Sequence, residues 1–154
     1  MISDSTHVRV ADKADLDGIL CVSRAVHQEN GVGAFDDGRV RTRIGMALRG
    51  ENAICGVIGP AHEIQGAVLL EIAQHWYSTD WFVSERFLCV LPEFRRSTNA
   101  KDLLAFAKGV ADELSLPLFC GVMSPNNIER KTIFYKKALG PASGVMWIYP
   151  PGAV

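Results

Sequence analysis

The stretch Leu88–Ala100 reads LCVLPEFRRSTNA and joins an apolar run to a helix start. The apolar residues predict a strand that stops at Pro92, and KDLLAFAKGVADEL continues the chain as an amphipathic helix. A strand that leads directly into a helix gathers free backbone N–H groups and the positive end of the helix dipole at one place. The junction therefore predicts an anion-binding site, and a phosphate or pyrophosphate is the expected ligand.

Five residues at this junction would supply the contacts. Arg95 and Arg96 add positive charge beside the amides, and Ser97, Thr98 and Asn99 are small or polar enough to leave those amides accessible. The helix dipole contributes only about 0.3–1 kcal/mol at an exposed site, so the guanidinium groups and the amides must act together. One alternative stays open here: Ser97 or Thr98 simply caps the helix, and both arginines are solvated.

Hydrophobic periodicity in the rest of the chain predicts a mixed α/β fold with an antiparallel meander of three strands and one right-handed crossover after it. In the last helix, Ile128, Ile133, Phe134 and Ala138 are the expected buried positions. The expected elements are a strand at 8–10, a helix from Asp12 to about residue 30, a helix at 39–50, strands at 53–59, 64–77 and 81–91, a helix at 100–116, a strand at 118–123, a helix at 126–139 and a strand at 143–149.

Length and composition predict one domain over residues 1–154, because 154 residues with 48% hydrophobic content suffice for one core. The net charge of −1 gives no overall field that favours nucleic acid or an anionic membrane. No leader and no apolar stretch near the roughly 20 residues of a membrane span is found. We therefore expect a soluble, cytoplasmic protein that binds neither nucleic acid nor membrane.

The cysteines and histidines show no metal-ligand spacing. Cys21, Cys55, Cys89 and Cys120 lie far apart and form no C-x-x-C pair, and three of them sit in apolar runs. We expect reduced, packed thiols and no metal site.

The residues Val90, Pro92, Phe94, Arg95 and Ala100 match a known pattern, roughly V-x-P-x-[FY]-[RQ]-x-x-G-x-[GA] followed by a helix. This segment resembles the acyl-CoA-binding motif of the GNAT acyltransferase superfamily. A strand, then a helix with Asn near its start and Tyr near its end before a glycine, also follows in LFCGVMSPNNIERKTIFYKKALG. The resemblance covers nearly the whole chain. It implies a mixed, mainly antiparallel central sheet that is flanked by helices and splayed to admit acyl-CoA.

The resemblance also implies acetyl-CoA as cosubstrate and transfer of its acetyl group to an amine by direct attack in a ternary complex. The backbone of the strand would pair with the pantetheine arm. Thr98 stands where the family pattern has a glycine, and its side chain either crowds the pyrophosphate or donates a hydroxyl to it. The implied cofactor-binding residues are Leu88, Cys89, Val90, Arg95, Arg96, Ser97, Thr98, Asn99, Ala100, Lys101 and Asn127.

The acceptor amine must lose a proton before it can attack. For a lysine-like amine at pH 7, reaching the neutral form costs roughly 4–5 kcal/mol. A positioned base helps to supply this energy. Glu85 resembles the catalytic glutamate of some family members, and strand alternation places it on one face with Phe87 and Cys89. Glu71 and His75 are the second and third choices for the base.

Tyr135 resembles the family's general acid, which protonates the departing thiolate. Both catalytic assignments have structural alternatives: Glu85 is solvated or pairs with Arg86, and Tyr135 is an amphipathic core residue. A non-catalytic acyl-CoA-binding or protein-interaction protein of the same fold is the alternative function.

Two groups of residues are candidates for the acceptor side. Glu29, Asp36 and Asp37 would attract a cationic amine, or they belong to a solvated polar loop. Trp76, Tyr77 and Trp81 would form an acceptor wall or a homodimer contact, or they take part in ordinary packing. The acceptor itself, a small molecule or a protein, is left open by the sequence.

Overall fold

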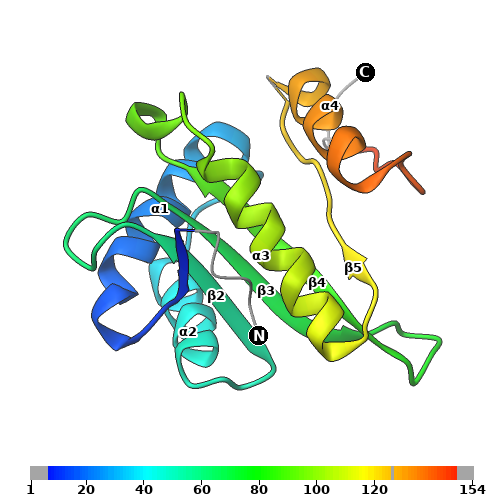
Figure 1. Cartoon of the computed structure of the whole chain (residues 1–154), viewed down its shortest axis with the longest axis horizontal. Helices are drawn as coiled ribbons and strands as arrows, with labels where there is room; N and C mark the ends of the chain where they lie inside the picture. Colours follow the sequence, from blue (N-terminus) through cyan, green and yellow to red (C-terminus); the bar gives the residue numbers. More distant parts are fainter. Residues whose placement is uncertain (1–6, 126, 149–154) are drawn as a thin grey trace.

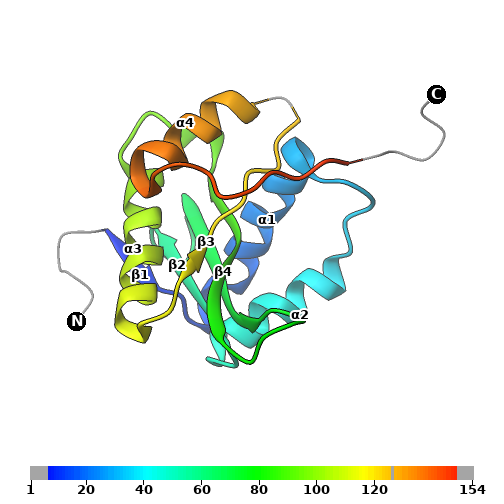
Figure 2. The ribbon, with the colours of Figure 1, turned by 90° about the vertical axis from the view of Figure 1, so that its right-hand side faces the viewer.

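A computed structural model of the chain describes residues 7–125 and 127–148. Its elements are β1 (Val8–Val10), α1 (Leu16–Asn30), α2 (Asp37–Leu48), β2 (Ala53–Ile58), β3 (Gly66–Gln74), β4 (Trp81–Val90), α3 (Asn99–Leu114), β5 (Leu118–Phe119) and α4 (Ile128–Leu139). The helix α3 covers one face of the sheet, and α1 and α2 cover the other (Figures 1 and 2). In Figure 1, α4 lies on the β4 side of the sheet, at the far end from β1. No helix of the described residues is long and apolar enough to cross a membrane.

The sheet has five strands in the order β1-β2-β3-β4-β5. The first four strands pair antiparallel, and β5 pairs parallel to β4 after the crossover through α3. The parallel pairing is limited to Val83↔Leu118 and Ser84↔Phe119. Beyond Ser84 the two strands part, so the expected mixed and splayed sheet is confirmed.

An ion pair between Arg9 and the buried carboxylate of Asp15 fixes the start of α1 against the sheet. The Asp15 carboxylate is 0% exposed and accepts two hydrogen bonds of 2.7 Å from the Arg9 guanidinium. It also accepts the Asp12 backbone N–H at 2.8 Å, and the Asp12 side chain accepts the Ala14 N–H, which completes a capping box. The hydrogen bonds from Arg9 lower the pKa of Asp15 despite its burial. The predicted helix start at Asp12 and Asp15 is therefore confirmed.

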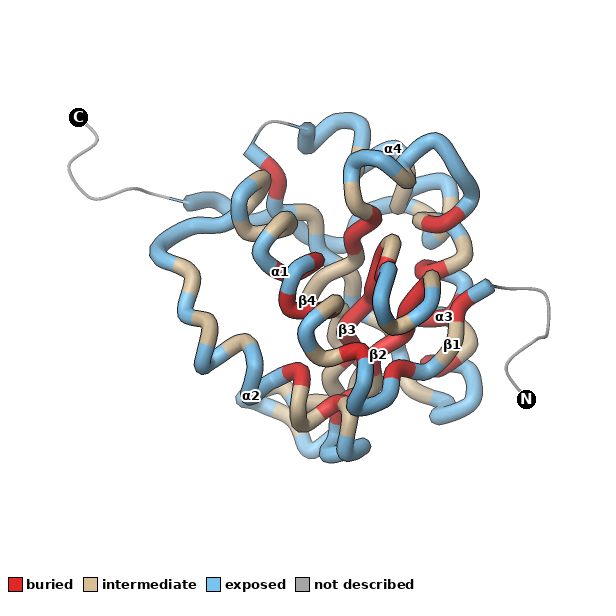
Figure 3. Tube along the Cα trace, turned by 90° about the vertical axis from the view of Figure 1, so that its left-hand side faces the viewer, coloured by how far each residue is buried: buried red, intermediate tan, exposed pale blue. Residues whose placement is uncertain are grey.

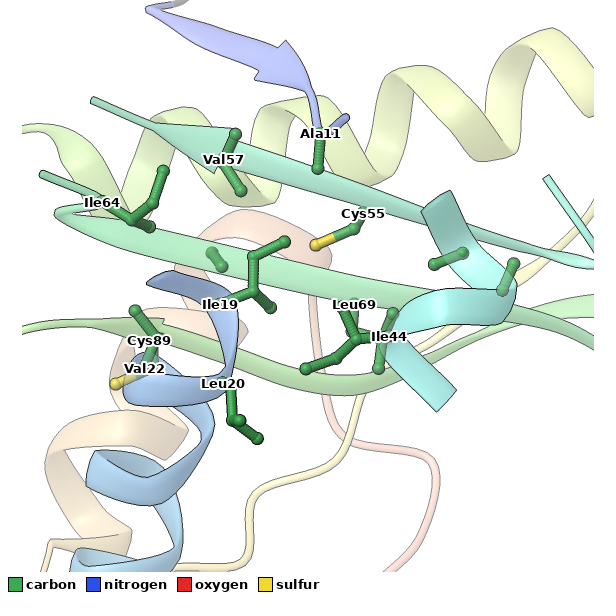
Figure 4. Close-up of a cluster of buried hydrophobic side chains, with 13 residues drawn as sticks. Ala11, Ile19, Leu20, Val22, Ile44, Cys55, Val57, Ile64, Leu69 and Cys89 are labelled. Carbon is green, nitrogen blue, oxygen red and sulfur yellow. The ribbon is translucent and has the colours of Figure 1, made fainter. Parts of the chain in front are cut away.

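Two hydrophobic clusters hold the layers together, one on each face of the sheet, and Figure 4 shows the one on the α1/α2 side. The α1/α2-side cluster consists of Ala11, Ile19, Leu20, Val22, Ile44, Ala47, Ala53, Cys55, Val57, Ile64, Ala67, Leu69 and Cys89. The α3-side cluster consists of Val8, Ile58, Val68, Leu70, Val83, Val90, Leu103, Phe106, Ala107, Val110 and Ala111. The two clusters anchor β4 on both faces and so fix the strand that leads to the loop before α3.

A β-bulge in β4 changes the direction of the side chains around Glu85. Leu69 pairs with Phe87 and Leu70 pairs with Glu85, so Arg86 has no partner of its own on β3. Since cross-strand partners share a face, Phe87 faces the α1/α2 side and Glu85 faces the side of Leu70. The prediction that Glu85 and Phe87 share a face is therefore wrong, because one extra residue shifts the alternation.

The C-terminal part of the chain contains less strand than predicted. The strand expected over 118–123 spans only Leu118–Phe119, and residues 143–148 form no strand, while residue 149 of that predicted strand lies outside the described residues. Val145, Met146 and Trp147 are 79–81% exposed. A strand needs a hydrogen-bonded neighbour, and this apolar segment has none in the described structure.

The burial expected for α4 is also wrong. Ile128 and Ile133 are 54% and 57% exposed, and no residue of α4 is fully buried. The helix lies beyond the sheet edge instead of on a sheet face, so the apolar positions of the predicted stripe have no sheet to cover (Figure 3).

Candidate active site

The outer edge of β4 is open where β5 has moved away. The Leu91 N–H donates to the Gln65 carbonyl at 2.8 Å, which lies on the β3 side. Because successive residues direct their backbone groups to opposite edges of a strand, Leu88 and Val90 direct theirs to the parted side. The Val90 carbonyl accepts the Arg95 Nε–H there at 2.8 Å. An extended ligand can therefore line up along this edge as a further strand would.

The loop between β4 and α3 presents unpaired amides, as the sequence predicted. In the part of the chain that the structure describes, no hydrogen-bond acceptor lies on the backbone N–H groups of Arg96, Ser97, Thr98, Ala100 and Lys101. No side chain caps α3. These donors lie at the positive end of the helix, which is the arrangement that binds anions.

The polar side chains of this loop are engaged inside the protein. The Ser97 hydroxyl donates to the Phe94 carbonyl at 2.6 Å, and the Thr98 hydroxyl donates to Asp102 at 2.8 Å. The Asn99 side chain is 8% exposed and donates to Gln65 at 3.3 Å. The Thr98 hydroxyl therefore points at the first turn of α3 and away from a ligand. The loop would bind a ligand mainly through its backbone N–H groups.

The two arginines of the loop have different surroundings. Arg95 donates to the Glu29 carboxylate at 2.5 Å as well as to the Val90 carbonyl, so it ties the loop to α1 and to the end of β4. Arg96 is exposed, and no ion pair of the described residues includes it. Arg96 is therefore the arginine that is free to contact an anion.

The structure brings Glu85 and Tyr135 together across the gap between β4 and α4. The Tyr135 hydroxyl lies 2.9 and 2.8 Å from the two carboxylate oxygens of Glu85. Burial raises the pKa of Glu85, and the hydrogen bonds from Tyr135, the nearby Cys120 thiol and the charge of Lys131 oppose that rise. Burial and the Glu85 charge also raise the pKa of Tyr135, so the phenol keeps its proton at neutral pH. The pair combines a carboxylate of raised basicity with a phenolic proton donor.

The second-choice base, Glu71, is occupied by arginines. Its side chain is 13% exposed and pairs with Arg86 at 2.5 Å and with Arg43 at 3.7 Å. Two guanidinium groups therefore already occupy this carboxylate. Its surroundings favour a structural role.

The aromatic residues near the β3–β4 turn form a ring stack around His75. The His75 ring lies 5.0 Å from the Tyr77 ring and 4.2 Å from the Phe82 ring, nearly parallel to both. Trp76 and Trp81 are 95% and 46% exposed. His75 and Tyr77 therefore take part in ring packing, whereas Trp76 lies on the surface.

The acidic residues predicted for the acceptor side are already bonded. Asp36 accepts a backbone N–H at the start of α2 at 2.8 Å. Asp37 pairs with Arg24, and Glu29 pairs with Arg95. A cationic amine would therefore compete with these arginines for Asp37 and Glu29.

Comparison with known proteins gives structural relatives only. No family model and no curated protein matches the chain. Among solved structures, aminoglycoside acetyltransferase AAC(6')-Iy in complex with a CoA bisubstrate analogue aligns with a TM-score of 0.70 at 15% identity, over 95% of this chain and 97% of that chain. A Trypanosoma brucei acetyltransferase aligns with a TM-score of 0.68 at 16% identity, over 93% and 97% of the two chains. An integron cassette protein from a salt-marsh metagenome aligns with a TM-score of 0.69 at 19% identity, over 96% and 91%.

The chain has the GNAT fold. The five-stranded sheet with β4 and β5 parted and the helices on both faces match these acetyltransferase structures over nearly their whole length. Two features of this structure fit the two parts of an acyl-CoA. The open edge of β4 fits the extended pantetheine arm, and the free amides before α3 fit the pyrophosphate.

Two residues, Cys120 and Ser124, were not among the predicted site residues. The Cys120 thiol lowers the pKa of the nearby Glu85, although its apolar surroundings predicted an inert thiol. The Ser124 hydroxyl is buried, with the residue 3% exposed, and has no hydrogen-bond partner in the described structure. A buried polar group without a partner is rare and fits a site that takes up a ligand. Asn127, predicted to bind the cofactor, is exposed just before α4 and does not cap it.

We expect Glu85→Gln to stabilise the protein at neutral pH but not in acid. Because the folded-state pKa of Glu85 is raised, its contribution to stability is fully present below the pKa of about 4.3 of an unfolded glutamate and is lost as the pH rises through the folded value. Glutamine carries no charge and still accepts the Tyr135 hydroxyl. Thermal unfolding between pH 4 and pH 8 should show the variant gaining over the wild type as the pH rises.

A Glu85→Gln difference from the wild type that stays the same between pH 4 and pH 8 would contradict the raised pKa of Glu85.

Proposed function

We propose that this protein is an N-acetyltransferase that uses acetyl-CoA to acetylate a small-molecule amine. The observation that carries the proposal is the contact of the Tyr135 hydroxyl with both oxygens of Glu85, at 2.8 and 2.9 Å, at the place where β4 and β5 part. Acetyl-CoA, when bound, supplies an acetyl group activated as a thioester. The outward backbone of Leu88 and Val90 would hold its pantetheine arm, and the loop amides with Arg96 its pyrophosphate.

Two residues of the chain would move protons during the reaction. Glu85 accepts the proton that the attacking amine nitrogen loses as the N–C bond forms, and its raised pKa makes it a stronger base than an exposed glutamate. Tyr135 donates its phenolic proton to the sulfur as the C–S bond breaks. Glu85 then returns its proton to Tyr135 across their hydrogen bond. Both residues regain their starting states, and one proton has passed from the amine to the thiol.

The structural relatives support the substrate class. One of them is bound to a bisubstrate analogue that joins CoA to an acetylated neamine, and an aminoglycoside acetyltransferase from a soil metagenome is bound to sisomicin. Both acceptors are small molecules with amino groups. The alternative, a non-catalytic acyl-CoA-binding protein, would leave the hydrogen-bonded Glu85 and Tyr135 without a purpose at this position.

We expect Arg96→Ala to weaken CoA binding about tenfold, or about 1.4 kcal/mol, because Arg96 is the exposed arginine beside the loop amides. Isothermal titration calorimetry with CoA would measure this loss, and the urea midpoint should not change. Arg39→Ala, at another exposed arginine on α2, is the control and should bind CoA like the wild type. Equal affinity of the Arg96→Ala and wild-type proteins would remove the loop from the cofactor site.

We expect Glu85→Gln to lower turnover by about 10²-fold or more and to leave CoA affinity nearly intact, because the carboxylate acts on the amine and not on the cofactor. Tyr135→Phe should have a milder effect, since a thiolate of pKa near 8.5 leaves fairly well unaided. Thiol release from acetyl-CoA over a panel of amines, aminoglycosides included, would measure both.

Two results would decide against this assignment. Full activity of Glu85→Gln with loss of activity in Glu71→Gln would place the base on β3. Tight CoA binding with no thiol release for any amine of the panel would favour the non-catalytic alternative.

A further inference from the structure

Two polar contacts join α4 to the rest of the protein. The Lys131 ammonium donates to the Asn30 side-chain carbonyl at 3.1 Å, across 101 positions of the chain. One helical turn later, the Tyr135 hydroxyl meets the Glu85 carboxylate at 2.8 and 2.9 Å. Within the described residues, these are the side-chain hydrogen bonds that link α4 to other elements.

The hydrophobic core contributes little to the placement of α4. Neither hydrophobic cluster contains a residue of α4, and no residue of this helix is fully buried. Residues of α1, α2 and α3 do belong to the two clusters, so burial of apolar surface holds those helices against the sheet. The position of α4 therefore depends to a larger extent on its two polar contacts.

Lys131 and Tyr135 lie on the same face of α4, because residues four apart in a helix are neighbours. Their partners belong to different elements, since Lys131 contacts the end of α1 and Tyr135 contacts β4. A single contact would leave the helix able to rotate about it. Two contacts to different elements fix the direction of the helix, so the Lys131 contact restricts where Tyr135 lies.

The end of α1 is well suited to hold an ammonium group. Asn30 is the last residue of α1, and the carbonyl groups at the C-terminal end of a helix carry partial negative charge that favours a cation. A lysine ammonium only donates hydrogen bonds, so the amide oxygen of Asn30 faces it. The preceding residue, Glu29, pairs with Arg95 of the loop between β4 and α3. Adjacent residues of α1 thus hold both this loop and the helix that carries Tyr135.

We propose that Asn30 and Lys131 are positioning residues that hold α4 where the Tyr135 hydroxyl reaches Glu85. The proposal rests on the proposed function, in which Tyr135 donates a proton to the leaving sulfur. Asn30 and Lys131 act through Tyr135 and need no contact with the substrates. The end of α1 thereby sets the geometry of the proton-transfer pair.

Carbon-13 NMR of protein labelled at the tyrosine Cζ atoms tests this role without any turnover. The Tyr135 signal is assigned by its loss in Tyr135→Phe, and Glu85→Ala shows the direction in which the signal shifts when its acceptor is absent. Asn30→Ala should shift the signal in that same direction, because α4 loses its contact with α1. Asn30→Asp should leave the signal at its wild-type position, because a carboxylate oxygen still accepts the lysine.

Substitution of Asn30 is the sharper test, because the charge of Lys131 also acts on Glu85. Asn30→Ala removes the hydrogen bond and keeps that charge. Lys137→Met, at an exposed lysine of the same helix, is the matched control and should not move the Tyr135 signal. An unshifted signal in folded Asn30→Ala would overturn the proposal. So would an Asn30→Asp protein whose signal shifts as far as that of Asn30→Ala.

Turnover then tests the catalytic part through a double-mutant cycle. Asn30→Ala should lower kcat about threefold to tenfold, with the KM for acetyl-CoA nearly unchanged, and Asn30→Asp should keep the wild-type kcat. In the Tyr135→Phe background, Asn30→Ala should lower kcat by less than about twofold, because Asn30 acts through Tyr135.

Two kinetic results would overturn the positioning role while acetyl transfer stands: an unchanged kcat in Asn30→Ala, or equal losses of kcat in the wild-type and Tyr135→Phe backgrounds. Absence of thiol release in every variant, the wild type included, would instead count against the proposed function. The NMR comparison would still decide whether the contact between α1 and α4 places Tyr135.

Discussion

The separation of β4 from β5 after the Ser84↔Phe119 pair is the constraint on which the rest of the structure depends. It leaves the outward backbone groups of Leu88 and Val90 without a neighbouring strand. It also opens the side of the sheet at which α4 lies, so that Tyr135 reaches Glu85. The bulge at Arg86 bends β4 at the same level. One local disruption of the sheet thus leaves the outer edge of β4 open and brings Tyr135 to Glu85, and the proposed function rests on these two features.

The features that the sequence predicted correctly are encoded locally. Asp12 and Asp15 form a capping box within four residues, and the proline and polar residues after Val90 mark the change from strand to helix. The free amides expected at the strand-to-helix junction also lie within one continuous segment of the chain. Local signals of this kind do not depend on the tertiary arrangement, so they could be read from the sequence.

The features that the sequence did not predict depend on distant partners. The direction of Glu85 follows from a two-against-one pairing with β3, which leaves no mark in β4 alone. The partner of Arg95 is Glu29, 66 residues away. The apolar run at 143–148 has high β-propensity but no strand beside it. Residue alternation and β-propensity show that a segment is able to form a strand, but the segment forms one only where a neighbouring strand pairs with it.

Glu85 is a buried carboxylate whose ionised form destabilises the folded protein. Its burial raises its pKa, and the hydrogen bonds from the Tyr135 hydroxyl oppose this rise. A destabilised group of this kind is common at sites where activity requires it. By contrast, the buried Asp15 is fully satisfied by Arg9 and by a backbone N–H, as a structural carboxylate should be. The difference between these two buried carboxylates is the physical argument for a functional role of Glu85.

Amide hydrogen–deuterium exchange with and without acetyl-CoA tests the central claim most directly, because it reports on the backbone groups that the parted strands leave free. The account predicts that acetyl-CoA slows exchange at Leu88, at Val90 and across residues 96–101, and leaves the amides of β1 and β2 unchanged. Protection confined to another part of the chain, or no protection at saturating acetyl-CoA, would contradict the claim that the gap beside β4 is the cofactor site.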